Sequence, residues 1–176
     1  MVEQDRAPAR LGALIRADVA ANPRNPKAQV ILTLFRLASS ARGGGRSPRL
    51  ASVPIGILYR VLVDWLLGVE LPWRTSVGPG VILDHGVGLV VNDATVIGAG
   101  VRLRHGVTLG TRAASGGSPV LEDGVDVGSG AQILGAVRIG AGARIGAGAI
   151  VLTDVSPGAT AVGNPARVIE PGGPAS

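Results

Sequence analysis

The stretch Leu121–Ser156, LEDGVDVGSGAQILGAVRIGAGARIGAGAIVLTDVS, decides the fold because it repeats every six residues. Each of its six consecutive blocks begins with Leu, Ile or Val, and the fifth position of each block is Val or Ala. Glycine is frequent at the second and fourth positions. This pattern predicts short strands that turn a large aliphatic and a small side chain toward one interior. Three such strands make a coil of about 18 residues, and the coils stack through backbone hydrogen bonds.

The same period extends upstream to residue 91, with one interruption at residues 110–119, GTRAASGGSP, which we expect to project as a loop from a corner. Before residue 91 the register is offset, because Leu89-Val90 are two extra residues. Asp84-His85 and Arg104-His105 take the same positions in their blocks and lie one coil plus this slip apart. We therefore expect the two histidines to share a corner of adjacent coils, about 5 Å apart along the axis.

The composition fits a narrow and regular interior. Of the 176 residues, 46% are hydrophobic but only 2% are aromatic, so Val, Ile, Leu and Ala must fill the core. The length suits one domain of ordinary size with a small appendage. There is no cysteine, which excludes disulfides, thiolate metal sites and cysteine nucleophiles in this chain.

The N-terminal part differs from the repeat region. Helical spacing of apolar residues predicts helices over residues 9–20, 28–42 and about 54–67. We expect a helical region over residues 1–70, a β-helix domain over residues 71–170 and a flexible tail over residues 171–176.

Charge and hydropathy limit the classes of partner. Residues 1–74 carry a net charge of +6, from 11 basic and 5 acidic residues. We interpret this charge as a solvated basic surface and expect no nucleic-acid partner, since the chain has no nucleic-acid-binding motif and almost no aromatic residues for stacking. The longest apolar segment, Ile55–Val69, is short and contains Arg60 and Asp64, so we expect no stable membrane insertion. The N-terminus lacks the apolar core of a signal peptide, and we expect a cytoplasmic protein.

His85 beside Asp84 suggests general-base chemistry, in which a carboxylate orients an imidazole that takes a proton from a hydroxyl. Adjacent strand residues point apart, so a solvated corner histidine is the alternative. A metal site is disfavoured, because the chain has two histidines, no cysteine and no His-X-X-His spacing.

Five segments resemble the serine O-acetyltransferases, in the same order: LDHGVGLVV (83–91), VRLRHGVTLG (101–110), GAQILG (130–135), RIGAGAIVL (144–152) and AVGNPARVI (161–169). The similarity covers about residues 60–169. Two stretches, VELPWRTSVGPG and RHGVTLG, look more like the colanic-acid-type exopolysaccharide acetyltransferases. Both branches imply a mainly β fold, a left-handed parallel β-helix of hexapeptide repeats after an N-terminal α-helical region, and acetyl-CoA-dependent O-acetyl transfer.

The resemblance also implies roles for individual residues. His85 matches the catalytic base, and Asp84 matches the acidic residue that positions the acceptor. The aspartate that orients the histidine falls at Glu70, a longer carboxylate. The family's acceptor-binding Arg-His pair falls at Gly117 and Ser118, so we expect L-serine to be a poor acceptor.

The remaining expectations concern binding. By the same resemblance, backbone contacts to coenzyme A map near Gly110, Ser129 and Ala147, and we expect N–H groups near Gly110 to stabilise an oxyanion. We expect His105 to bind or position the acceptor rather than to remove its proton. Acetyl-CoA is the expected co-substrate, and no metal is expected.

A prism is convex, so we expect a homotrimer with sites in the grooves between prisms. The C-terminal PGGPAS differs from the isoleucine end of family members that dock into cysteine synthase, so we expect no such docking. We expect the acceptor to be a small-molecule hydroxyl: L-serine, another hydroxy acid, or a sugar or exopolysaccharide hydroxyl. The alternative from another class is a non-catalytic trimeric binding scaffold.

Overall fold

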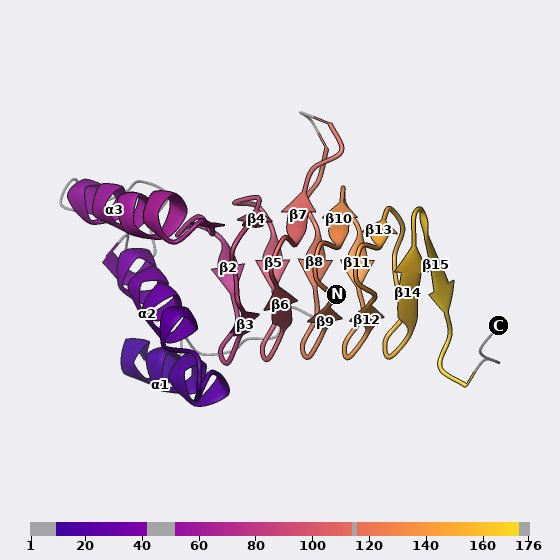
Figure 1. The fold of residues 1–176 in the computed structure, drawn as a ribbon, viewed down its shortest axis with the longest axis horizontal. Helices are drawn as coiled ribbons and strands as arrows, with labels where there is room; N and C mark the ends of the chain where they lie inside the picture. The colour runs from indigo at the N-terminus through magenta and orange to yellow at the C-terminus, as the bar shows by residue number, and fades with distance from the viewer. Residues whose placement is uncertain (1–9, 42–51, 114–115, 173–176) are drawn as a thin grey trace.

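The computed structural model describes residues 10–41, 52–113 and 116–172, and within these residues it has helices at one end and a long stack of strands (Figure 1). The predicted tail over residues 171–176 lies mostly outside the described residues. The helices are α1 (Leu11–Ala21), α2 (Pro26–Ala41), α3 (Ser52–Arg60) and a π-helical turn η1 (Val61–Leu66). No helix in the described part of the chain is long and apolar enough to cross a membrane.

The start of α2 shows how the sequence sets a helix boundary. The Asn25 Oδ1 accepts a hydrogen bond from the Ala28 backbone N–H at 3.0 Å, as an N-cap residue does. Pro26 follows at the first helical position, where its missing N–H is not needed. The α1–α2 turn is therefore defined by its own residues, and it later forms one wall of a pocket.

The described strands form three sheets that run along the sides of a triangular prism of about five turns. We call the sheet β1-β4-β7-β10-β13 the Glu70 face, the sheet β3-β6-β9-β12-β14-β15 the Asp84 face, and the sheet β2-β5-β8-β11 the third face. Pairing is parallel throughout, except in the closing β14–β15 hairpin. The fold is a left-handed parallel β-helix. Its strands are β1 (Val69–Glu70), β2 (Ser76–Val77), β3 (Ile82–Asp84), β4 (Leu89–Val91), β5 (Val96–Ile97), β6 (Arg102–Arg104), β7 (Thr108–Gly110), β8 (Val120–Leu121), β9 (Asp126–Val127), β10 (Gln132–Leu134), β11 (Arg138–Ile139), β12 (Arg144–Ile145), β13 (Ile150–Val151), β14 (Thr160–Gly163) and β15 (Ala166–Ile169).

The interior of the prism confirms the hexapeptide reading. The first and fifth positions of all six blocks are buried: Leu121, Val125, Val127, Ala131, Ile133, Val137, Ile139, Ala143, Ile145, Ala149, Val151 and Val155. The interruption of the repeat is also found, because the described residues 111–113 and 116–119, between β7 and β8, form no strand.

The predicted position of the two extra residues was wrong. Leu89 and Val90 belong to β4, where they pair with Val69 and Glu70 of β1. The register shows where the extra residues lie, since Asp84 is opposite Arg104 and Val90 is opposite Thr108. The corner between β3 and β4 is thus two residues longer than the equivalent corner between β6 and β7 on the next coil. Side chains alternate between the two faces of a strand, so an extra residue within a strand would turn its buried side chains outward. The two extra residues therefore lie in the corner that carries His85.

The helices are fixed to the first coil by a buried ion pair. Arg36 Nε lies 2.8 Å from Asp18 Oδ2, and both side chains are almost fully buried. Arg36 also donates to the carbonyl oxygens of Val77 at 2.7 Å and Gly78 at 2.6 Å. Asp18 Oδ1 accepts from the Gly80 backbone N–H at 2.8 Å. Every charge in this cluster is paired, and the cluster ties α1 and α2 to the start of the prism.

Aromatic residues gather at the same junction. The Tyr59 ring lies 6.5 Å from Phe35 and 6.1 Å from Trp73, between centroids. Gly56 allows this packing, because a Cβ atom there would lie 2.5 Å from the Trp73 ring. The close approach of α3 to Trp73 helps to shape a pocket on the Glu70 face.

Candidate active site

His85 occupies the lengthened corner between β3 and β4, which we call the histidine corner. Its φ is +67°, and among the residues that the structure describes it is the only one other than glycine with a positive φ. The Val87 N–H donates to the His85 carbonyl at 2.7 Å, which closes a tight turn around Gly86. Left-handed backbone costs a residue with a Cβ about 1–2 kcal/mol. The corner therefore carries an exposed imidazole on a strained backbone conformation.

The two histidines meet as the sequence predicts. The ring centroids of His85 and His105 are 6.3 Å apart, and the ring planes are inclined at 69°. His105 Nδ1 lies 3.5 Å from Ser129 Oγ on the next coil. The backbone stacking continues along the histidine corner, since Gly130 N donates to the His105 carbonyl and Gly148 N donates to the Ser129 carbonyl, both at 2.9 Å.

An ionic ladder on the Asp84 face was not predicted from the sequence. Asp84 Oδ2 accepts from Arg102 Nη1 at 2.7 Å and lies 3.9 Å from Arg104 Nε. Arg104 also forms an ion pair with Asp126 of the next coil. Each of these side chains is about one-third exposed. The sequence did contain a signal for these ion pairs, because the charged residues take outward positions on strands that pair across successive coils.

Asp84 and His85 line one pocket, which we call the His85 pocket. Its volume is about 940 Å³, and it lies between the α1–α2 turn and strands β3 and β6. The lining residues are Ala21, Asn22, Pro23, Arg24, Asn25, Ile82, Asp84, His85 and Arg102. The sequence had not predicted that the turn would lie beside the histidine, because no periodicity relates a helix turn to a coil 60 residues later.

A second hollow, the Ser129 pocket, brings together two of the residues assigned to coenzyme A. Ser129 and Ala147 line it, with Arg104 and Arg144, and its volume is about 340 Å³. Backbone atoms are close here, because a Cβ on Gly128 would lie 2.5 Å from the Ala147 nitrogen. Glycine at this position therefore lets the two coils approach closely at one wall of the Ser129 pocket.

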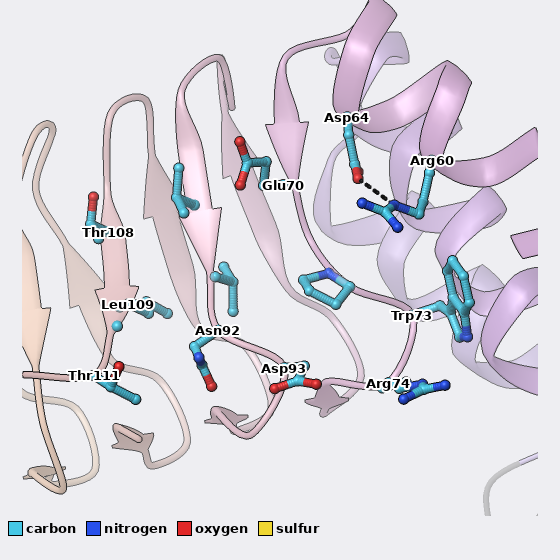
Figure 2. A pocket seen from close by; sticks show the side chains of 14 residues that line it. Arg60, Asp64, Glu70, Trp73, Arg74, Asn92, Asp93, Thr108, Leu109 and Thr111 are labelled. Atoms are coloured by element: carbon cyan, nitrogen blue, oxygen red, sulfur yellow. Dashed lines mark ion pairs between the residues drawn. The ribbon is translucent and has the colours of Figure 1, made fainter. Parts of the chain in front are cut away.

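Glu70 and Gly110 lie in a third pocket, the Glu70 pocket, of about 690 Å³. Figure 2 shows Glu70 on its strand and the Arg60–Asp64 pair on the adjoining helix. Asp64 Oδ2 is 3.5 Å from Arg60 Nε, while its Oδ1 is buried without a hydrogen-bond partner among the described residues. Burial raises the pKa of Asp64, the nearby Arg60 opposes this rise, and the charge of Glu70 adds to it.

Some predicted site residues are not brought together within one chain. Of the residues that the structure describes, Glu70 and His85 share no hydrogen bond or ion pair and line different pockets. Ser118 lies beyond the Glu70 face, at the corner that leads to the third face, where its Oγ donates to Asn92 Oδ1 at 2.8 Å. Gly110 ends β7 near that same corner. In the described residues, no three His, Asp or Glu side chains are grouped as metal ligands.

Comparison with known proteins gives structural neighbours. No model of a protein family matches the chain, and no curated protein matches its sequence. A soybean serine acetyltransferase apoenzyme superimposes with a TM-score of 0.77 and 34% identity, over 90% of this chain and 69% of that one. A Neisseria gonorrhoeae serine acetyltransferase in complex with serine gives 0.73 and 30%, over 89% and 68%. A Brucella abortus serine acetyltransferase in complex with coenzyme A gives 0.73 and 29%, over 90% and 67%.

The soybean and Neisseria neighbours superimpose on 90% and 89% of this chain. Sequence identity at this level, over this coverage and with this superposition, shows common membership and not only a common fold. The chain therefore belongs to the hexapeptide-repeat acetyltransferases of the serine acetyltransferase family, and it is an acyltransferase.

Proposed function

We propose that the protein transfers an acetyl group from acetyl-CoA to the hydroxyl of a small molecule, with His85 as the general base. The observation that carries the proposal is the exposed His85 imidazole on a strained corner, beside a pocket of about 940 Å³. Support for the co-substrate comes from the Brucella relative, which was solved with coenzyme A.

The reaction proceeds by direct transfer. His85 takes the proton of the acceptor hydroxyl as its oxygen attacks the thioester carbonyl. The tetrahedral intermediate collapses with cleavage of the C–S bond, and the coenzyme A thiolate takes the proton back from the imidazolium. Backbone N–H groups near Gly110 or Ser129 are suited to stabilise the oxyanion. The chain has no cysteine to form a thioester intermediate.

We further propose that the active unit is a homotrimer. His85 and Ser118 lie at different corners of one prism, so both can face a single acceptor only across an interface between copies. An exposed apolar surface supports assembly, because a monomer rarely leaves so many large hydrophobic residues in water. These residues are Val53, Ile55, Ile57, Leu58, Val61, Trp65 and Leu66. Light scattering should give about three times the chain mass of 17.6 kDa, and an active monomer would contradict the interfacial site.

Glu70 is proposed to orient His85 within this assembly, and His105 to hold the acceptor or the thioester oxygen. The role of Glu70 rests on its match to the aspartate of the family, and the role of His105 rests on the 6.3 Å separation of the two imidazoles. A sugar hydroxyl is the second candidate acceptor, since Gly117 and Ser118 offer no charge for an amino-acid carboxylate. A cytoplasmic location is proposed because acetyl-CoA is available there.

Thiol release from acetyl-CoA tests the proposal, with L-serine, homoserine and nucleotide sugars as acceptors. The proposal expects acceptor-dependent release in wild type and its loss in His85→Asn. Asparagine tolerates left-handed backbone, so this variant keeps the corner and removes only the base. Release at the wild-type rate in His85→Asn would reject His85 as the base, and no release with any hydroxyl acceptor would reject the proposed transfer.

A further inference from the structure

The charge balance of the His85 pocket carries information about the acceptor. Among its lining residues, Asp84 is the carboxylate, while Arg24 and Arg102 are two guanidinium groups. With a neutral His85, the lining therefore carries a net charge of +1. A wall of this sign favours an anionic ligand.

The two asparagines do not change this balance, because their amides hold the α1–α2 turn against the prism. Both donor hydrogens of Asn22 are used, in bonds of 2.8 Å to the carbonyls of Asp18 and Val81. Its Oδ1 accepts from the Leu83 N–H at 3.1 Å. Asn25 donates to the Leu83 carbonyl at 2.8 Å and caps α2. The ionic side chains are left to decide what the pocket binds.

The carboxylate in the pocket is already neutralised. Asp84 Oδ2 is 2.7 Å from Arg102 Nη1, and Arg104 Nε is 3.9 Å away. An ammonium group entering the pocket would have to compete with Arg102 for this oxygen and would face Arg24 as a like charge. The other oxygen, Asp84 Oδ1, has no hydrogen bond to any described residue, and it is free to accept one from a neutral hydroxyl.

The charge of Arg24, unlike that of Asp84, is not neutralised by any described residue. Arg24 is exposed at the rim of the His85 pocket, and it makes no hydrogen bond or ion pair with any residue in the described ranges. A guanidinium group binds carboxylate and phosphate with two parallel hydrogen bonds, and such charge-assisted bonds are the strong ones. An anionic ligand is the partner that this side chain lacks.

From this pocket we infer that the acceptor is a hydroxyl compound that carries a carboxylate or a phosphate and no ammonium group near the reacting hydroxyl. Arg24 binds the anion, Asp84 Oδ1 accepts a neighbouring hydroxyl, and the reacting hydroxyl faces His85. This inference rests on the proposed acetyl transfer and names the class of its acceptor.

The test is steady-state acetylation with two matched sets of acceptors. The first set is glycerol, glycerate, glycerol 3-phosphate and L-serine; the second is glucose, glucuronate, glucose 6-phosphate and glucosamine. We expect the anionic members to have the highest kcat/KM within a set and the ammonium compounds the lowest. A preference for carboxylate or for phosphate identifies the source of the negative charge.

Variants separate the role of Arg24 from general effects of charge. Arg24→Gln should lower kcat/KM for the preferred anionic acceptor by about tenfold to a hundredfold, mainly through KM, and should leave its neutral counterpart within about twofold. Arg16→Gln is the control, because Arg16 is exposed on α1 and does not line the His85 pocket. Raising the salt concentration should reduce the advantage of the anionic acceptor in wild type.

The outcomes separate this inference from the proposed function. A preference for neutral or ammonium acceptors in both sets, or an equal effect of Arg24→Gln on anionic and neutral acceptors, overturns the inference while acetyl transfer stands. Binding of acetyl-CoA without binding or acetylation of any anionic member also overturns it. Failure of calorimetry to detect acetyl-CoA binding would instead count against the proposed function itself.

Discussion

Replacing His85 should separate stability from activity. At φ = +67° the backbone of this residue favours glycine. A residue with a Cβ loses about 1–2 kcal/mol in this conformation, whereas glycine costs about 0.5–1 kcal/mol through its freer unfolded chain. His85→Gly should therefore be more stable than His85→Ala by about 0.5–1 kcal/mol, because the exposed imidazole makes few packing contacts that either variant would lose.

Both variants should lose acetyl transfer by a factor of about 10² to 10⁴, the usual contribution of a general base. Urea unfolding, followed by circular dichroism at one protein concentration, measures the stability difference, and thiol release measures the activity. A glycine variant that is less stable than the alanine variant would refute the strained corner. A variant that keeps near wild-type kcat would refute the role of the imidazole.

Three further predictions concern residues around the site. His105→Gln should reduce kcat/KM by a moderate factor, since glutamine keeps a hydrogen-bonding end, and a loss as complete as that of the base would mean that the two histidines act as a coupled pair. Asp64 has a raised pKa in the folded protein, so the folded state holds its proton more tightly and stability falls as pH rises from about 4 through that raised value. Asp64→Asn should remove this fall in stability. Urea unfolding of wild type and variant at acid and neutral pH measures it, and an equal change in the free energy of unfolding of both proteins would contradict the prediction. Arg36→Met should cost about 3–5 kcal/mol by leaving Asp18 buried with an unpaired charge, and a change below about 1 kcal/mol in urea unfolding would argue against the paired cluster.

The repeat region could be predicted because its physics is local and periodic. Most of the short strands bury one aliphatic side chain at a fixed place in the period, so Leu121 and its counterparts reveal the prism directly. The convergence of His85 and His105 followed from the same count. Residues whose place in the fold follows from the six-residue repeat can therefore be located from the sequence alone.

The parts of the site that depend on other contacts were not visible. The extra residues of the histidine corner were assigned to Leu89 and Val90, because periodicity counts residues but does not say which of them leave the strand. The wall of the His85 pocket comes from a helix turn held by Asn22, and its contact with β3 spans about 60 residues. Side-chain pairs such as Asp84 with Arg102 depend on rotamers, which a strand pattern does not specify.

The proposed function depends on direct acetyl transfer from acetyl-CoA to an acceptor hydroxyl, with His85 as the base. A single-turnover experiment with excess protein tests it most directly, with free thiol and acetyl ester measured in the same quenched samples for wild type and His85→Asn. Direct transfer should give one acetyl ester on the acceptor for each thiol released, no acetyl group on the protein, and a rate at least about 100-fold lower in the variant. An acetylated protein that forms and decays on the pathway, or a His85→Asn variant that turns over at the wild-type rate, would contradict the claim.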